Sequence, residues 1–263
     1  MPDIAPAPAG DPPVAKPTLE ERYLIVPDWP APPNVGALAT TRGGGCSAAP
    51  YDSLNLGTHV GDDDGAVAAN RRLLRERLSA APRWLSQVHG LHCVDVAAVD
   101  DGVEADAGFS RTSRHACAVL TADCLPVLLC DEAGTVVAAA HAGWRGLASG
   151  VIEATVAAMR VPAPRLMAWL GPAIGPGAFE VGDEVRAAFL AADAATAAAF
   201  VPHGPGKWLC DLYALARRRL ARLGVERVSG GGFCTHADSG RFFSYRRDGV
   251  TGRMATLVWL ASD

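Results

Sequence analysis

Short apolar runs rich in β-branched residues alternate along this 263-residue chain with longer segments rich in Ala, Leu and Arg. The short runs have the length and composition of buried strands, and the longer segments have those of amphipathic helices. Alternation of this kind favours an α/β domain, and the length is enough to bury a large core. We therefore predict an α/β fold with a mixed sheet and surrounding helices.

The individual elements follow from apolar periodicity and from turn residues. The acidic turn at residues 62–64 favours a helix start, and Gly224 favours a helix end. We expect strands near Gly36–Thr41, Trp84–Val88, Cys93–Val99, Ala116–Leu120, Pro126–Cys130, Val136–His141, Leu166–Leu170 and Thr256–Ala261. We expect helices near Ala66–Leu78, Leu147–Arg160, Glu184–Phe200 and Leu212–Leu223.

The first seventeen residues differ from the rest of the chain. Residues 1–17 are rich in Pro and Ala, without a basic start or a continuous apolar segment, so they do not resemble a secretory signal. Their composition is typical of a disordered tail. Residues 18–263 contain no internal repeat and no linker, and we expect them to form a single catalytic domain.

Charge and cysteine content exclude several classes of protein. A formal net charge of −4 argues against non-specific binding to nucleic acid or to an anionic membrane. No apolar run is long enough to span a bilayer. The seven cysteines are scattered and include no Cys-x-x-Cys pair, so they do not predict a disulfide scaffold. We expect a cytoplasmic protein with no nucleic-acid or membrane partner and no evident obligate protein partner.

Two polar runs, Thr-Ala-Asp-Cys-Leu-Pro-Val and His-Ala-Gly-Trp-Arg-Gly, lie at either end of an apolar stretch within residues 121–146. They put Cys124 and His141 at the ends of neighbouring predicted strands, and His89 ends another short apolar run. Two imidazoles and one thiol at strand ends can form a nucleophile–base pair or a three-ligand metal site. Their wide spacing is not that of a zinc finger, but it suits an open catalytic site. The residues alone leave both interpretations open.

Each of these residue types also has an ordinary structural explanation. A free cysteine is usually a small buried hydrophobe, and we assign that role to Cys117 and Cys130 inside apolar runs. An isolated histidine is usually satisfied by a nearby backbone carbonyl. Asp123 and Pro126, however, interrupt the strand at Cys124, and an interrupted strand end presents a side chain to a cleft.

Other side chains are candidates for substrate binding. Arg42 begins a glycine-rich loop, and Arg145 lies in a Gly-containing turn before a predicted helix, so each is a candidate anion ligand. Asn55 and Gln87 can bind a base or ribose edge, although buried amides that satisfy loop backbone are commoner. Phe179 follows a rigid Gly-Pro loop and either lines a pocket or packs in the core.

Two further features of the sequence are less specific indicators of a binding site. The segment at residues 244–249, together with Arg253, is either another anion contact or a solvated turn. His59 lies beside the acidic turn, and we interpret it as a structural or surface histidine.

Several motifs occur in order over roughly residues 35–260. They are Thr40-Thr41-Arg42, Ser53-Leu54-Asn55-Leu56-Gly57, Gln87-Val88-His89-Gly90, Thr121-Ala122-Asp123-Cys124, His141-Ala142-Gly143-Trp144-Arg145-Gly146, Phe179-Glu180-Val181-Gly182 and Ser244-Tyr245-Arg246-Arg247. In these motifs the chain resembles the multicopper-polyphenol-oxidase-like laccase-domain family. Bacterial members of that family are also described as purine nucleoside phosphorylases and as peptidoglycan editing factors.

The resemblance implies a single α/β domain similar to cysteine–histidine toxin deamidases. It implies a metal, usually zinc, on His89, Cys124 and His141. It further implies phosphorolysis of adenosine, inosine, guanosine and methylthioadenosine, adenosine deamination, and copper-dependent phenol oxidation. The seven histidines include no His-x-His pair, which argues against a multicopper cluster. Gly177 stands where some relatives carry a cysteine.

We therefore predict a zinc-dependent purine nucleoside phosphorylase with adenosine deaminase activity, whose partners are purine nucleosides and phosphate. Copper is the alternative metal, with phenol oxidation as its chemistry. Arg42 or Arg145 is expected to hold phosphate, and Asp123 is the candidate general acid. A rival hypothesis makes Cys124 a nucleophile and His141 its base, in an amidase that edits peptidoglycan precursors. The third hypothesis is a non-enzymatic module that binds a metal and interacts with a partner.

Overall fold

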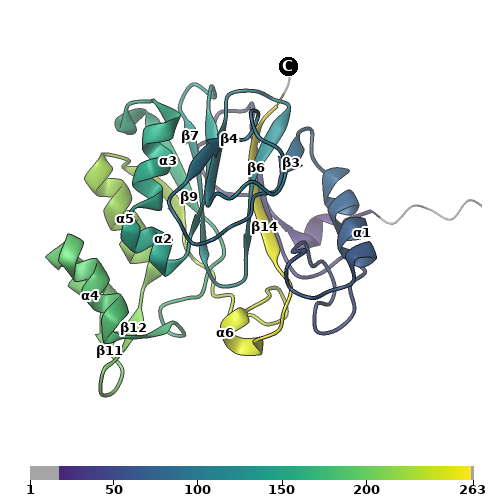
Figure 1. The fold of residues 1–263 in the computed structure, drawn as a ribbon. Helices are drawn as coiled ribbons and strands as arrows, with labels where there is room; N and C mark the ends of the chain where they lie inside the picture. Colours follow the sequence, from purple (N-terminus) through teal and green to yellow (C-terminus); the bar gives the residue numbers. More distant parts are fainter. Residues whose placement is uncertain (1–17, 262–263) are drawn as a thin grey trace, which may run out of the picture.

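Two mixed β-sheets pack face to face in the centre of the molecule (Figure 1), in a computed structural model that describes residues 18–261. The expected tail at residues 1–17 lies outside the described residues. The five-stranded sheet has the order β1-β2-β14-β6-β3. Its strands are β1 (Leu24–Ile25), β2 (Val35–Thr40), β3 (Ala81–Arg83), β6 (His115–Thr121) and β14 (Met254–Leu260).

The second large sheet has six strands in the order β13-β9-β7-β8-β5-β4, with parallel pairs at its two edges and antiparallel pairs between them. Its strands are β4 (Cys93–Asp95), β5 (Ala107–Ser110), β7 (Leu125–Asp131), β8 (Val137–Ala142), β9 (Leu166–Leu170) and β13 (Arg227–Gly230). A small third sheet contains β10 (Glu180–Gly182), β11 (Phe200–Pro202) and β12 (Lys207–Cys210).

Helices cover the outer faces of both large sheets. The helices of the described residues are α1 (Asp64–Arg75), α2 (Trp144–Ser149), α3 (Val151–Met159), α4 (Asp183–Ala192), α5 (Leu212–Leu223) and α6 (Tyr245–Asp248), with short 3₁₀ turns at Glu21–Tyr23, Ala163–Arg165 and Ala194–Ala199. Of these, α4 packs against the small sheet. In Figure 1, α2, α3 and α5 lie on one side of the paired sheets and α1 lies on the other. None of the helices in residues 18–261 is long and apolar enough to cross a membrane. The layers confirm the predicted α/β class.

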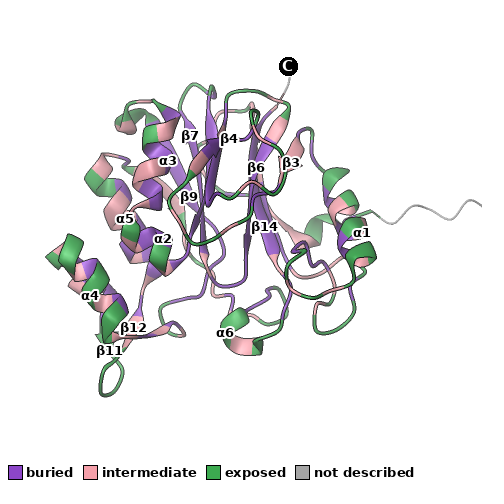
Figure 2. Ribbon diagram, in the orientation of Figure 1, coloured by how far each residue is buried: buried purple, intermediate pink, exposed green. Residues whose placement is uncertain are grey.

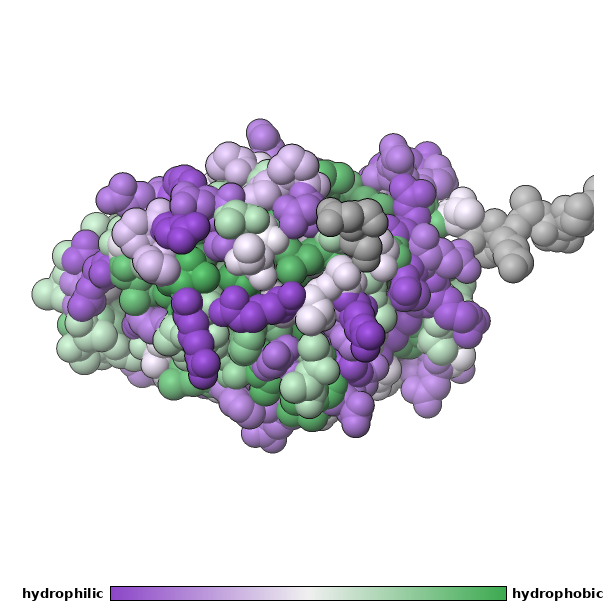
Figure 3. Space-filling model, turned by 90° about the horizontal axis from the view of Figure 1, so that it is seen from above, coloured by the Kyte–Doolittle hydropathy of each residue, from purple (hydrophilic) through white to green (hydrophobic). Residues whose placement is uncertain are grey.

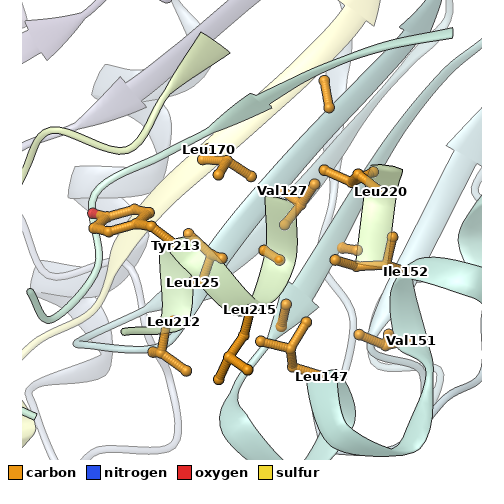
Figure 4. Close-up of a cluster of buried hydrophobic side chains, with 14 of the residues drawn as sticks. Leu125, Val127, Leu147, Val151, Ile152, Leu170, Leu212, Tyr213, Leu215 and Leu220 are labelled. Atoms are coloured by element: carbon orange, nitrogen blue, oxygen red, sulfur yellow. The ribbon is translucent and has the colours of Figure 1, made fainter. Parts of the chain in front are cut away.

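Buried apolar side chains form separate clusters in these layers. Between the sheets, Val119 and Val258 of one sheet pack with Leu128 and Val137 of the other. Cys117 and Cys130 are buried in the same layer, as predicted. Leucine and valine side chains from β7, β9 and the covering helices α2, α3 and α5 interdigitate on the outer face of the six-stranded sheet (Figure 4).

Burial follows this layering (Figure 2): the strands of the large sheets are mostly buried, and the outward sides of the helices are exposed. The face shown in Figure 3 intersperses hydrophilic and hydrophobic residues. The removal of the core side chains from water is the main favourable contribution to folding.

Several predicted elements differ from the structure. The expected helix Leu147–Arg160 is two helices, α2 and α3, because Gly150 between them has a φ of 105°. The expected helix Glu184–Phe200 ends early, since Asp193 caps a separate 3₁₀ turn. The expected strand Trp84–Val88 is wrong: β3 precedes it, and residues 84–88 form a loop that the edge of β6 holds through Gln87. The helix Leu212–Leu223 and the strand Leu166–Leu170 are confirmed.

Candidate metal centre

The three predicted ligands meet at one end of the paired sheets. Cys124 lies in the connection from β6 to β7, where the chain passes from one large sheet to the other, and His141 lies near the end of β8. One donor atom from each of His89, Cys124 and His141 lies within 4.8 Å of the others. The Sγ of Cys124 is 3.8 Å from Nε2 of His89, and the two imidazole rings are 4.8 Å apart between centroids.

The backbone around the cluster adopts uncommon conformations. His89 has a φ of 61° and Asp123 a φ of 94°, in the left-handed region that non-glycine residues rarely occupy. Such conformations cost roughly 1–3 kcal/mol each and persist where surrounding contacts impose them. At Asp123 those contacts are hydrogen bonds from Thr235 Oγ1 at 2.6 Å and from the backbone N–H of Arg246 at 2.7 Å. Both carboxylate oxygens of Asp123 are therefore already used to fix the wall beside Cys124.

Asp106 holds the other side of the cluster and was not predicted from the sequence. Its carboxylate accepts hydrogen bonds from the backbone N–H groups of Val88, His89 and Gly90, at 3.1, 2.9 and 2.6 Å. Its Oδ1 also pairs with Nδ1 of His141 at 2.8 Å. The only sequence signal is an acidic residue directly before the apolar run of β5, which does not reveal these partners.

The charges in the cluster are strongly coupled. Burial acts to raise the pKa of the Cys124 thiol. The charges of His141 and His89, together with the hydrogen bonds that these residues form with the thiol, outweigh burial and lower the pKa to about 6. Burial acts to lower the pKa of His141, but Cys124 and Asp106 outweigh it and raise the pKa to about 9. The metal-free site therefore favours a thiolate beside an imidazolium.

The donor set fits a soft divalent metal such as zinc. One thiolate and two imidazoles are zinc ligands, and three protein ligands leave a fourth position open, as in catalytic zinc sites. The carboxylate of Asp106 on Nδ1 of His141 is the outer partner that a ligating histidine usually has. Gly143 leaves room at the cluster, because a Cβ there would lie 2.9 Å from Sγ of Cys124 and 2.9 Å from Cδ2 of His89. The thiolate also suits monovalent copper.

A pocket of about 600 Å³ opens in front of the cluster. Of the predicted substrate-binding residues, Gln87, Arg145 and Phe179 line it. The pocket also contains five residues that were not predicted to bind substrate, namely His59, Trp144, Tyr245, Arg246 and Arg253. The amide of Gln87 exchanges two hydrogen bonds with the backbone of Leu120, at 2.7 and 2.8 Å, so it shapes the pocket wall.

Two predicted substrate ligands lie outside this lining. Arg42 donates to the backbone carbonyls of Asp52 and Ser239, and its guanidinium lies over the ring of Phe243. Asn55 is fully buried and bonds to backbone and side-chain groups of the loop at residues 55–62 and to Arg253. Both residues have structural partners in place of a ligand, which sequence position alone did not reveal.

A second hollow of about 730 Å³ lies beside β10 and is more open. It contains Cys234, whose Sγ accepts hydrogen bonds from the backbone N–H groups of Gly175 and Ala237. None of the three clustered ligands lines this hollow, so we place the chemistry in the pocket of His89, Cys124 and His141.

The fold and this cluster can be compared with those of known proteins. The family model described as multi-copper polyphenol oxidoreductase laccase matches residues 36–261. The chain belongs to this family. Within the laccase family it is 59% identical over 237 residues to a purine nucleoside phosphorylase of Pseudomonas aeruginosa, covering 90% of this chain and 98% of the relative. It is 55% identical over 240 residues to the purine nucleoside phosphorylase YfiH of Escherichia coli strain K12, and the match covers 90% of this chain and 98% of the relative.

Solved structures of the same family have this fold. The crystal structure of a Neisseria meningitidis protein matches with a TM-score of 0.90 and 54% sequence identity, covering 91% of this chain and 100% of that one. The structure of YlmD from Geobacillus stearothermophilus matches with a TM-score of 0.77 and 29% identity, and the match covers 88% of this chain and 93% of that one. The resemblance seen in the sequence motifs is confirmed.

Proposed function

We propose that this protein is a zinc-dependent purine nucleoside phosphorylase. The observation that carries the proposal is the cluster of His89, Cys124 and His141 in a pocket that also contains three arginines. Two relatives that share more than half of their aligned residues with this chain are named purine nucleoside phosphorylases. All seven cysteines are unpaired, which suits the reducing cytoplasm where we place the enzyme.

The pocket suits a nucleoside in size and chemistry. A volume of about 600 Å³ lies within the range of small-molecule sites, which combine apolar walls with a few polar groups. Phe179, Trp144 and Tyr245 offer aromatic surface for a flat base. We propose adenosine, inosine, guanosine and methylthioadenosine as substrates.

The proposed reaction joins phosphate to the sugar. A phosphate oxygen forms a bond to ribose C1′, the C1′–N9 bond breaks, and its electron pair leaves with the purine, which takes up a proton. The products are the free base and the 1-phosphate of the sugar, which is ribose 1-phosphate for adenosine, inosine and guanosine and 5-methylthioribose 1-phosphate for methylthioadenosine. Arginine side chains of the pocket hold the phosphate against the sugar by charge and position. A bound zinc ion would supply a Lewis acid beside the substrate.

Asp123 takes a different part from the one expected. Its two carboxylate oxygens already accept hydrogen bonds from Thr235 and Arg246. We therefore assign Asp123 a positioning role in place of the general-acid role suggested by the sequence. Deamination of adenosine, in which water replaces the amino group and ammonia leaves, is the secondary reaction that we propose for the same pocket.

One observation supports the rival amidase hypothesis. Asp106, His141 and Cys124 form a chain of carboxylate, imidazole and low-pKa thiol, which is also the arrangement of a cysteine nucleophile with an oriented base. In that enzyme the Cys124 sulfur forms a bond to the amide carbon, the C–N bond breaks, and the leaving amine takes a proton from His141. Water then hydrolyses the thioester, and no metal is required.

A substrate panel with and without metal separates the two hypotheses. The zinc-loaded protein is incubated with each nucleoside and phosphate, and free base and ribose 1-phosphate are measured. We expect turnover that is lost with a chelator, restored by zinc and absent in Cys124→Ser, while the exposed Cys46→Ser control stays active. Full amide cleavage in the presence of chelator, with nucleosides untouched, would reject the phosphorylase. Bound zinc without turnover of any substrate would favour the interaction module.

A further inference from the structure

Arg253 is a partly buried cation of the pocket that forms no salt bridge with a carboxylate among the described residues. It lines the pocket, and no salt bridge within residues 18–261 joins it to an acidic side chain. Its Nη1 donates to the backbone carbonyls of Thr251 and Gly252 at 2.9 and 3.0 Å. These bonds fix one edge of the guanidinium, while Nε and Nη2 have no hydrogen-bond partner among the described residues.

The loop at residues 55–57 is shaped to hold this arginine. Oδ1 of the fully buried Asn55 accepts hydrogen bonds from the backbone N–H of Arg253 at 2.8 Å and of Gly57 at 2.9 Å. A Cβ on Gly57 would lie 2.8 Å from Cγ of Arg253, so the arginine stem rests directly on the glycine backbone. Asn55 therefore acts through Arg253, which it positions at the pocket.

Groups of both charge signs lie around Arg253. Partial burial lowers the pKa of His59, and the charges of Arg253 and Arg71 lower it further. Burial lowers the pKa of Arg253 itself, while the negative charges of Cys124 and Asp123 act in the opposite direction. Arg253 thus lies near His59 on one side and near Asp123 and the metal cluster on the other.

The other two arginines of the pocket are less suited to this role. Arg145 is exposed and lies over the ring of Trp144 at 4.5 Å. Arg246 is also exposed, and its Nη1 is engaged by the backbone carbonyl of Glu180 at 2.7 Å. A guanidinium that is already fixed and partly desolvated loses less entropy on binding an anion than a mobile surface arginine does.

We propose that Arg253, together with His59, forms a subsite for a phosphate group, beside the metal cluster. The free edge of the guanidinium supplies charged N–H donors, and the His59 ring supplies a further polar contact. This inference deepens the proposed function, because in a phosphorylase the subsite holds the phosphate co-substrate. The same chemistry would hold the 5′-phosphate of a nucleotide substrate.

Phosphate binding is measured directly on the zinc-loaded protein, by calorimetric titration with inorganic phosphate in the absence of nucleoside. We expect Arg253→Met to weaken binding about tenfold or more, as loss of a charged hydrogen bond predicts, and Arg253→Lys to restore part of it. Zinc content and circular dichroism show that each variant is folded. Arg22→Met, an exposed arginine paired with Glu20, is the control and is expected to bind as the parent does.

A second titration, with adenosine 5′-monophosphate against adenosine, identifies the source of the phosphate. Arg253-dependent binding of inorganic phosphate supports the co-substrate, and Arg253-dependent binding of the nucleotide alone supports a substrate phosphate. Equal binding by the parent and Arg253→Met in both titrations overturns the subsite, as does a loss confined to Arg145→Met.

If phosphate binds through Arg253 but no nucleoside is phosphorolysed, the proposed function fails and the subsite stands. If turnover occurs with an unchanged KM for phosphate in Arg253→Met, the subsite fails and the function stands.

Discussion

The carboxylate of Asp106 is 2.8 Å from Nδ1 of His141, and both side chains are buried. The same carboxylate accepts hydrogen bonds from the backbone at His89 and its two neighbours. One acidic side chain therefore orients the imidazole of one proposed ligand and the backbone that carries another. Because Nδ1 of His141 is occupied by Asp106, Nε2 is left to face the cluster.

The substitution Asp106→Asn tests this positioning role. An amide presents N–H groups where the carboxylate only accepts, so it cannot satisfy all of its present donors. We expect zinc affinity to fall about 10- to 100-fold, as is typical when the outer partner of a ligating histidine is lost. Competition with a chromophoric chelator measures the affinity, and near-ultraviolet circular dichroism checks the fold. Asp100→Asn, an exposed aspartate, is the control. Unchanged zinc affinity in Asp106→Asn would contradict the assignment.

The substitution Gly143→Ala tests the space at the cluster. A Cβ at Gly143 would lie 2.9 Å from both Sγ of Cys124 and Cδ2 of His89, closer than real Cβ contacts, so the ligands must move apart. We expect zinc binding and nucleoside turnover to fall by an order of magnitude or more while the protein stays folded. Gly177→Ala is the matched control, since nothing lies within 4 Å of a Cβ there. Equal activity of the two variants would show that the cluster tolerates the added methyl group.

Metal binding is also expected to stabilise the fold. A ligand that binds only the native state adds about 2.7 kcal/mol when its free concentration is 100 times its Kd. Zinc should therefore raise the melting temperature of the parent protein, and Cys124→Ala should lose most of that rise. Scanning calorimetry with and without zinc measures both, and Cys46→Ala, at an exposed thiol, should keep the full rise. A zinc-dependent rise that survives in Cys124→Ala would place the metal elsewhere.

Two of the proposed ligands were predictable because each lies at the end of an apolar run. Cys124 directly precedes β7 and His141 lies near the end of β8, and both strands are buried throughout and therefore read as continuous apolar segments. Strands that end at one edge of the sheets bring such residues together. The helix Leu212–Leu223 was predictable for a related reason, since it has strong apolar periodicity and a glycine at its end.

The partners of those ligands were not predictable, because they depend on contacts between distant segments. Asp106 reaches His141 across 35 residues, and Asn55 reaches Arg253 across 198 residues. Nothing in the local sequence distinguishes a buried aspartate that receives four hydrogen bonds from an exposed one. Arg42 and Asn55 were assigned to the substrate partly for the same reason, because one structural partner of each, Ser239 and Arg253 respectively, lies far along the chain.

Asp131 closes the turn between β7 and β8 and should make the stability of the fold depend on pH. Its carboxylate accepts hydrogen bonds from N–H and Oγ1 of Thr135, both at 2.7 Å, and from the N–H of Val136 at 3.0 Å. Burial acts to raise the pKa of Asp131, but these bonds outweigh it and the pKa is lowered. Such a carboxylate stabilises the fold above its unfolded pKa of about 3.9, and the contribution is lost as pH falls through the lower, folded value.

Asp131→Asn should therefore lower the free energy of unfolding by about 1–3 kcal/mol at pH 7, because buried donors lose a charged acceptor. The difference from the parent should shrink as the pH falls below about 4, where the carboxylate of the unfolded parent is already protonated. Urea unfolding of both proteins at pH 7 and at acidic pH measures this. The neighbouring Glu132→Gln, which removes only an exposed ion-pair partner, should change stability little. A difference for Asp131→Asn that is constant with pH would mean that its hydrogen bonds do not depend on the carboxylate charge.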